Sequence, residues 1–350
     1  MHYLGIIGFG GVANWHYGNL QGLSDRITVK GVYDINPAKG EIAKSLGLVS
    51  YGSAKELLDD ADIDIVLVST PNNFHKEYVI SALEAGKNVI CEKPVALSVS
   101  DFDEMCAVAE KCKKVFSVHQ NRRWDKDFRI VKKIYDDKII GEPFYIESRV
   151  QGANGIPGDW RFTKVAGGGM VLDWGVHLLD QILWMVKSPV TEVYANLYSI
   201  KAPEVDDNFK AILKFENGTT AHVQVDTYCF IPLPRWHVSG DAGTAVIDDW
   251  TCKGKIVKSK LVEMIYEPSI IYTGSGPTKT MSPRPSETIE TLPLPEDVDS
   301  DIKNLFRNLM DVIEGKAERI IKLEEVRRVL QVIEAIFESS KKGTAIKKQI

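Results

Sequence analysis

The fold is decided near the start of the chain by the stretch Leu4-Gly5-Ile6-Ile7-Gly8-Phe9-Gly10-Gly11-Val12-Ala13. A short apolar run, Leu4–Ile7, ends in glycines that fit the pattern G-x-G-x-x-G/A, and Val12–Leu23 can then form a helix. The first glycine allows a tight turn, the second lets a pyrophosphate approach the backbone, and the helix N-terminus offers free N–H groups. The stretch therefore predicts a dinucleotide-binding turn made by Gly8, Phe9, Gly10, Gly11, Val12 and Ala13.

Strand-like and helix-like stretches alternate over residues 1–120. The predicted strands after the first are Thr28–Tyr33, Ile63–Ser69, Asn88–Cys91 and Val115–His119. The predicted helices between them are Pro37–Leu46, Ser53–Leu58, Asn73–Ala85 and Ser98–Lys111. This alternation is typical of a parallel sheet with helices on both faces, so residues 1–120 are predicted to form an α/β Rossmann domain.

Asp34 and Ile35 follow the second predicted strand, where a dinucleotide-binding fold places its ribose contact. A carboxylate there can accept hydrogen bonds from the adenosine ribose and would repel a 2′-phosphate. Asp34 could instead only start a turn with Asn36-Pro37, and one residue can do both. The interpretation that we carry forward is a preference for NAD over NADP.

The pattern changes after Pro143, where longer strands are predicted around a hairpin signal at Asn217-Gly218. These strands are Phe144–Val150, Glu192–Ile200, Phe209–Phe215, Thr219–Tyr228, Arg235–Ser239 and Gly243–Ile247. Residues 121–300 are therefore predicted to form a C-terminal α+β domain on an open, mostly antiparallel sheet. Pro268–Pro295 is rich in Pro, Ser, Thr and Gly and predicts a long surface excursion, serving as an oligomer arm, a lid or only a loop. Two helices, Asp301–Glu314 and Glu324–Lys341, are predicted in residues 301–350.

Composition excludes several classes of protein. With 44% hydrophobic and 26% charged residues, the chain resembles an ordinary globular protein, and its 350 residues suggest two domains. The net charge of −5 and the lack of a basic stripe argue against nucleic acid as a partner. The best apolar segment, His177–Val186, contains Asp180, so no membrane span is predicted. The N-terminus lacks a charged n-region and a long apolar h-region, so no signal peptide is predicted and a cytoplasmic location is expected. The five cysteines are scattered without zinc-site spacing, which favours reduced thiols.

Three further segments indicate a family. They are Ser69–His75, Cys91–Pro94 with its Glu-Lys-Pro tripeptide, and Gly167–Asp180 with its D-x-G-x-H run. Together with the glycine turn, these segments resemble the Gfo/Idh/MocA oxidoreductases, a family that includes inositol dehydrogenases and glucose–fructose oxidoreductase. The resemblance covers nearly the whole chain except Pro268–Pro295.

The resemblance implies roles for particular residues. Lys93 and His177 would be catalytic, with Asp173 beside them, and the Lys93-Pro94 bond would be cis. It implies a homodimer or homotetramer, and final helices that pack back on the first domain. Together with the turn residues, Asp34 and Ile35, the residues expected along the cofactor NAD are Thr70, Pro71, Asn72, His75, Glu92, Lys93 and Asn121.

The chemistry of an alcohol dehydrogenase suits these residue types. Lys93 lies just beyond a parallel strand, where its ammonium can stabilise a developing alkoxide, and a neutral His177 can accept the hydroxyl proton. If Met170–Val186 is one helix, Asp173 and His177 share a face, so Asp173 could orient the imidazole or hold a substrate hydroxyl. Asp180 could be a further partner of His177 or only a solvated charge. Taken singly, a Lys before Pro is usually a surface residue, and a His on an apolar helix is usually a core residue. Their occurrence together, in the order of the family's motifs, favours the functional interpretation.

Arginines and tryptophans near the cleft are candidates for binding a polar ring. Arg122 and the pair Trp160-Arg161 could hold a sugar, although such pairs pack at domain and subunit contacts equally often. The predicted substrate contacts are Lys93, Arg122, Trp160, Arg161, Asp173 and His177. His75 or His119 could join Asp173 and His177 around a metal, but no local spacing supports this and no metal is predicted.

The function expected from the sequence is NAD-dependent hydride transfer to or from a secondary alcohol of a carbohydrate or cyclitol. Two alternatives stay open: a redox-neutral, NAD-dependent glycoside hydrolase or lyase, and a non-catalytic NAD-binding sensor. The residues do not indicate which sugar, glycoside or inositol is used, nor the physiological direction.

Overall fold

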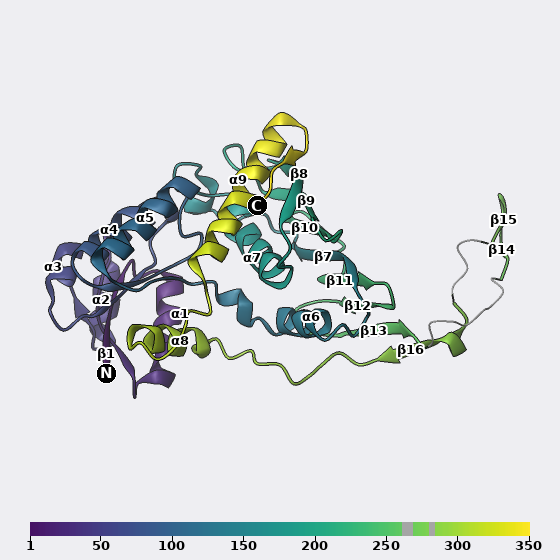
Figure 1. Cartoon of the computed structure of the whole chain (residues 1–350). Coiled ribbons are helices and arrows are strands. Elements are labelled where there is room, and N and C mark those ends of the chain that lie inside the picture. Colours follow the sequence, from purple (N-terminus) through teal and green to yellow (C-terminus); the bar gives the residue numbers. More distant parts are fainter. Residues whose placement is uncertain (261–268, 280–283) are drawn as a thin grey trace.

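The computed structural model describes residues 1–260, 269–279 and 284–350, and its strands form two large sheets (Figure 1). The first sheet has six parallel strands in the order β3-β2-β1-β4-β5-β6. This is the order of doubly wound dinucleotide-binding sheets, with the topological switch point between β1 and β4. Its strands are β1 His2–Ile7, β2 Ile27–Tyr33, β3 Val49–Ser50, β4 Ile65–Val68, β5 Asn88–Cys91 and β6 Phe116–Val118. The prediction of a Rossmann fold is confirmed.

Helices follow the strands of the first sheet, as the alternating sequence pattern requires. They are α1 Gly11–Leu20, α2 Pro37–Ser45, α3 Ala54–Asp59, α4 His75–Glu84 and α5 Val99–Cys112. Every residue of β4 and β5 is buried, which explains their nearly continuous apolar composition.

The second sheet has nine strands in the order β16-β13-β12-β11-β7-β10-β9-β8-β17. Every neighbouring pair is antiparallel except β7 and β10, so the predicted mostly antiparallel sheet is confirmed. Asn217-Gly218 joins β9 to β10 as predicted, and Gly218 has a φ of 87°. The strands are β7 Pro143–Gln151, β8 Val190–Tyr198, β9 Asn208–Phe215, β10 Thr220–Asp226, β11 Trp236–Gly240, β12 Gly243–Ile247, β13 Gly254–Ser259, β16 Ile289–Leu292 and β17 Ile346–Lys347.

The prediction for Pro268–Pro295 is partly wrong. Within it, β14 Ile271–Thr273 and β15 Gly276–Thr278 form a hairpin that projects from the body (Figure 1). Ile289–Leu292, however, is strand β16 at the edge of the second sheet. The reason is that Leu292 pairs with Ile256 of β13 and packs against the core. Residue 268 and residues 280–283 lie outside the described part of the chain.

The remaining helices connect the two sheets. They are α6 Lys126–Asp136, the π-helical turn Val171–Gly175, α7 Val176–Met185, α8 Lys303–Ile313 and α9 Leu323–Lys342. Figure 1 shows α7 and α9 between the sheets, and α9 packs against α5, α7 and β8. Short 3₁₀ segments lie at Gln21–Leu23, Asn72–Phe74, Asn121–Trp124, Trp160–Phe162 and Ser286–Thr288.

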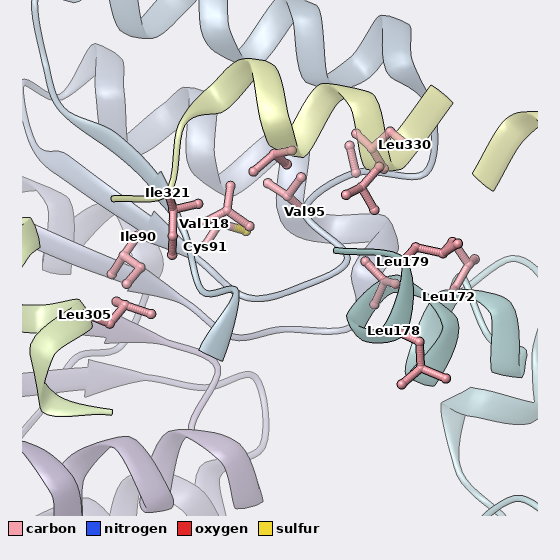
Figure 2. Packing of buried hydrophobic residues seen from close by; sticks show 14 of the residues in the cluster. Ile90, Cys91, Val95, Val118, Leu172, Leu178, Leu179, Leu305, Ile321 and Leu330 are labelled. Carbon is pink, nitrogen blue, oxygen red and sulfur yellow. The ribbon is translucent and has the colours of Figure 1, made fainter. Parts of the chain in front are cut away.

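One apolar cluster runs through both halves of the molecule. Figure 2 shows Ile90 and Cys91 of β5, Leu178 and Leu179 of α7, and Leu330 of α9 as parts of this cluster. The π-helical turn and α7 are thereby held opposite the carboxyl ends of β4 and β5. Among the described residues, no helix is long and apolar enough to cross a membrane.

Candidate active site

The glycine turn has the geometry of an anion-binding site. Gly8 has a φ of 89°, and a Cβ there would lie 2.8 Å from the carbonyl oxygen of Ser69. A Cβ on Gly10 would meet nothing within 4 Å, so the space beside this glycine is open to a ligand. Gly10 caps α1 without a side-chain acceptor. The first N–H groups of α1 can therefore bind the phosphates of a dinucleotide, which fits the predicted cofactor.

Asp34 contacts the glycine turn directly. Its Oδ2 accepts a hydrogen bond from the backbone N–H of Phe9 at 2.6 Å, and its Oδ1 accepts one from Asn36 at 2.8 Å. Asp34 therefore starts the turn that the sequence suggested and also holds the phosphate-binding loop. The ring of Phe9 is fully buried, whereas Val12 and Ile35 are exposed beside the turn.

The loops after β4 and β5 are tied together by His75. The His75 ring is fully buried, with Nε2 2.9 Å from the carbonyl oxygen of Thr70 and Nδ1 2.9 Å from that of Pro94. Burial lowers the pKa of His75. A direct contact between this ring and a cofactor would require one of these contacts to break, so the geometry gives His75 a role in shaping the two loops.

Asn72 and Asn121 lie at the junction between the two halves. Asn72, which follows Pro71 on the β4 loop, donates its Nδ2 hydrogen to the carbonyl oxygen of Gly167 at 2.8 Å. The buried Oδ1 of Asn121 has no hydrogen-bond partner among the described residues. An unsatisfied acceptor at this position is consistent with the cofactor contact predicted for Asn121.

Lys93 and Asp173 form the centre of the site. Lys93 Nζ donates to the Asp173 backbone oxygen at 2.8 Å and to its Oδ1 at 3.1 Å. Arg161 Nε donates to Asp173 Oδ2 at 3.2 Å. Burial alone would raise the pKa of Asp173, but Lys93 and Arg161 outweigh it and lower that pKa. The Lys93-Pro94 bond is cis, as the resemblance implies.

His177 is a buried, neutral base. It is 4% exposed, and its Nδ1 has no hydrogen-bond partner among the described residues. Burial, and then the positive charges of Lys93 and Arg122, lower the pKa of His177 well below its ordinary value. The imidazole therefore stays unprotonated near neutral pH and can accept a proton.

Two expectations about the partners of His177 are wrong. The Asp173 carboxylate accepts hydrogen bonds from Lys93 and Arg161 and is not bonded to the imidazole. The cause is local, since Asp173 lies in a π-helical turn, whose wider i→i+5 winding removes the face that residues at i and i+4 share in an α-helix. Asp180 is neither a partner of His177 nor solvated, because its carboxylate accepts two hydrogen bonds from Arg123 at 2.8 and 2.7 Å.

Arg123 connects α7 to the C-terminal helix α9. Besides its two bonds to Asp180, its fully buried guanidinium donates to Glu325 of α9 at 2.8 Å. It also lies over the Trp184 ring at 4.8 Å. This buried charge network holds α7 in place behind the site.

The other arginine–tryptophan candidates are partly engaged by the protein itself. Arg122 donates to Asp125 at 2.9 Å and lies over Trp174 at 4.1 Å. Arg161 lies over Trp160 at 4.6 Å and donates to Asp159 at 2.7 Å. Both pairs therefore pack as the sequence allowed, and Arg161 also reaches Asp173.

A cavity of about 470 Å³ opens beside Asp173 and Arg161. Its polar and aromatic wall residues include Gln151, Asn154, Asp159, Trp174, Asp226 and Thr227. Gln151 Nε2 donates to Asp226 Oδ2 at 2.8 Å, across the ends of the parallel pair β7 and β10. The sequence patterns give no sign of Gln151 and Asp226, because nothing in two ordinary strands marks their last residues as neighbours.

Glu92 faces away from the cavity, into a buried cluster with His16 and His119. Its Oε1 lies 2.6 Å from His16 Nε2 and 3.0 Å from His119 Nδ1, and its Oε2 accepts the backbone N–H of Lys93 at 3.2 Å. Burial would raise the pKa of Glu92, but the two histidines hold it well below its usual range. Tetrahedral zinc ligands about 2.0–2.1 Å from the metal would lie about 3.3 Å apart, farther than these two contacts. The His16 contact is a hydrogen bond, whereas neither ring nitrogen of His119 has a hydrogen-bond partner among the described residues. The cluster supports the Lys93 turn from behind.

Comparisons with known proteins agree with this geometry. The oxidoreductase family with an NAD-binding Rossmann fold matches residues 3–120, and the GFO/IDH/MocA C-terminal domain matches residues 128–246. The solved structure of an NAD-binding protein from Listeria innocua is similar to the chain with a TM-score of 0.95 and 48% identity, over 99% of both chains.

Curated relatives are more distant. A myo-inositol 2-dehydrogenase from Thermotoga maritima is 29% identical over 222 residues, which cover 61% of this chain and 65% of that protein. A D-glucoside 3-dehydrogenase from Escherichia coli is 30% identical over 191 residues, 53% of this chain and 54% of that protein. The chain thus spans about half to two thirds of the length of the curated relatives that it matches. With its two-sheet fold and its glycine turn, the chain belongs to the Gfo/Idh/MocA family of NAD-binding oxidoreductases.

Proposed function

We propose that this protein is an NAD-dependent oxidoreductase that moves a hydride between nicotinamide and a secondary alcohol or ketone of a sugar, glycoside or inositol. The observation that carries the proposal is the meeting of Lys93, Asp173 and a neutral His177 at the carboxyl ends of the first sheet, beside an open cavity. Open α/β sheets bind their ligands at this edge. The similarity to a myo-inositol 2-dehydrogenase and to a D-glucoside 3-dehydrogenase supports this class of substrate.

The cavity suits an uncharged polyol. Three carboxylates, those of Asp159, Asp173 and Asp226, lie on its wall with the guanidinium of Arg161. That guanidinium is already paired with Asp159 and Asp173. An excess of carboxylate favours hydroxyl groups as donors and disfavours phosphate or carboxylate substituents on the substrate.

Each catalytic residue has one task in this mechanism. Asp173 holds the Lys93 ammonium, which stabilises negative charge on the reacting oxygen. His177 takes the hydroxyl proton as general base, and returns it in the reverse direction. Bound NAD supplies the hydride acceptor, so the alcohol loses one hydride and one proton and leaves as a ketone. Asp34, at the glycine turn, is the basis for proposing NAD in preference to NADP.

The test is NADH formation with NAD or NADP and a panel of inositols, aldoses and glycosides. Lys93→Met and His177→Ala are expected to lower kcat by at least about 1,000-fold while NAD affinity changes only a few-fold, because both residues lie away from the phosphate turn. Lys76→Met, which alters a surface lysine paired with Asp101 and Glu104, is the matched control. Near-normal kcat in either site variant would remove its assigned role.

The absence of net NADH formation would distinguish the two alternative functions. Glycoside cleavage without net NADH would favour the redox-neutral hydrolase over the dehydrogenase. NAD binding without any turnover across alcohols and keto-sugars would favour the sensor.

We also propose that the protein is a homodimer or homotetramer. Sedimentation velocity of the whole protein will measure its oligomeric state.

A further inference from the structure

The turn that carries Asp173 begins against a loop from the second sheet. Asp206, between β8 and β9, is buried, and its Oδ2 accepts the backbone N–H of Val171 at 2.8 Å. The backbone oxygen of Asp206 accepts the N–H of Met170 at 2.9 Å. One residue therefore satisfies two orphan donors at the start of the π-helical turn, which no residue of that turn could satisfy itself.

Gly169, just before this turn, lies in close contact with the Asp206 carboxylate. Gly169 has a φ of 101°, and a Cβ there would overlap Asp206 Oδ1. The N–H of Gly169 donates to the Arg161 backbone oxygen at 3.1 Å, and the Gly169 oxygen accepts the N–H of Asp173 at 3.0 Å. The contact of Asp206 with the turn is thus built into backbone that connects directly to Asp173 and, through it, to Lys93.

We propose that Asp206 is a positioning residue that holds the first turn of the catalytic helix, so that Asp173 reaches Lys93 and His177 lies beside them. This inference rests on the proposed function. Asp206 touches none of the reacting groups and acts through Val171, two residues before Asp173. A misplacement of about 1 Å at a catalytic group costs about 100-fold in rate, so a loosened first turn has a measurable effect.

The hold of Asp206 depends on its charge. Burial raises the pKa of Asp206 to about 7, against the lowering effect of the N–H bond from Val171. The negative charge of its neighbour Asp207 contributes to this raised pKa. Since an ionised carboxylate accepts stronger hydrogen bonds than a neutral one, the hold weakens as the pH falls through about 7. The other charged groups on the surrounding segments are Glu204 and Lys164 on the loops, Arg161 beside the glycines, and Asp173 on the turn.

The test compares Asp206→Asn with Asp207→Asn as a matched control. Asp207 lies on the same loop and is fully buried, but its carboxylate accepts the N–H groups of residues 200–202, and none of its hydrogen bonds among the described residues reaches the turn. Hydrogen–deuterium exchange of peptides covering residues 169–177 is measured on the whole protein across neutral pH. Exchange rates are corrected with an unstructured reference peptide, and kcat is followed with the best substrate of the panel.

In the wild type, protection of residues 169–177 is expected to fall by about tenfold as the pH drops through about 7. Asp206→Asn should abolish this dependence and lower kcat by about tenfold or more, with the KM for NAD within about twofold. Asp207→Asn should keep the dependence but shift it to lower pH, because it removes a negative charge that raises the pKa of Asp206. Equal effects of the two variants, or an unchanged kcat in Asp206→Asn, would overturn the positioning role.

The exchange measurement needs no substrate, so it separates this inference from the proposed function. Suppose that no substrate of the panel is turned over, but the pH dependence of exchange disappears only in Asp206→Asn. The positioning of the turn by Asp206 is then supported, and the proposed reaction is contradicted. If turnover is found but exchange of the turn is the same in the wild type and Asp206→Asn, the proposed reaction stands and the positioning role fails.

Discussion

Asp34→Ala is expected to weaken NAD binding and to relax the discrimination against NADP. Asp34 directly follows β2, and its carboxylate accepts the Phe9 N–H at 2.6 Å, within the glycine turn. In this fold, the same carboxylate is placed to accept hydrogen bonds from the adenosine ribose. The substitution therefore removes an anchor of the turn, a ribose acceptor and a negative charge together.

The magnitude follows from the bonds that are lost. A hydrogen bond to a charged group is worth about 1.5–3 kcal/mol, which corresponds to an increase in the Kd for NAD of about 10- to 150-fold. A 2′-phosphate about 4 Å from the carboxylate would be repelled by about 4 kcal/mol per unit charge at an effective dielectric constant of about 20. Removing this repulsion offsets the loss of the bonds for NADP. The preference for NAD should consequently fall by at least about 100-fold.

The assay is calorimetric titration of the wild type, Asp34→Ala and Asp34→Asn with NAD and NADP at one ionic strength. Asp34→Asn keeps an acceptor for the Phe9 N–H but removes the charge, so it separates support of the turn from repulsion. We expect Asp34→Asn to lose most of the discrimination and less of the NAD affinity. A ratio of NAD to NADP affinity that is the same in all three proteins would refute the reasoning, provided that their melting temperatures agree.

Two other predictions concern pH and stability. Burial and the charges of Lys93 and Arg122 lower the pKa of His177 well below 6.5, so kcat should fall with the protonation of this base only below pH 6.5. Measuring the pH profile in Asp206→Asn removes the titration of Asp206 from it. A fall in kcat that begins above pH 6.5 in that variant would contradict the role of His177. Arg123→Met leaves Asp180 buried and unpaired, at a cost of about 3–5 kcal/mol. Dividing this free energy by an unfolding entropy of about 0.7 kcal/mol per kelvin for 350 residues gives a decrease in Tm of about 4–7 °C. Adding Asp180→Leu should restore most of the lost Tm. A Tm of Arg123→Met within about 1 °C of the wild type would contradict this prediction.

Local patterns were sufficient to predict the first half of the fold. The apolar run before Gly8, the glycine turn and the alternation of strand and helix each depend on residues close together in the sequence. Apart from the short strand β3, which was not predicted, the predicted and observed elements of residues 1–120 agree to within a few residues, because backbone geometry and burial period act locally. The hairpin at Asn217-Gly218 was predictable for the same reason.

Local patterns failed at two places in the chain. Strand β16 lies inside a segment rich in Pro and Ser, and it forms a strand because β13 offers an unpaired edge. Residues Met170–Val186 read as one α-helix, but the first turn is π-helical, held at its start by Asp206 from a distant loop. In both places a contact across the chain overrides the local preference.

By itself, the sequence determined the dinucleotide turn, the alternation of strands and helices in residues 1–120, the two-domain architecture and the family. It also named Lys93, Asp173 and His177, because their motifs are short and lie at strand or helix ends. Only the tertiary structure decided which of these side chains bind one another. Asp173 pairs with Lys93 and Asp180 with Arg123 because the apolar cluster brings α7 against the first sheet, and the free energy of a buried charge is set by the partner that folding places beside it.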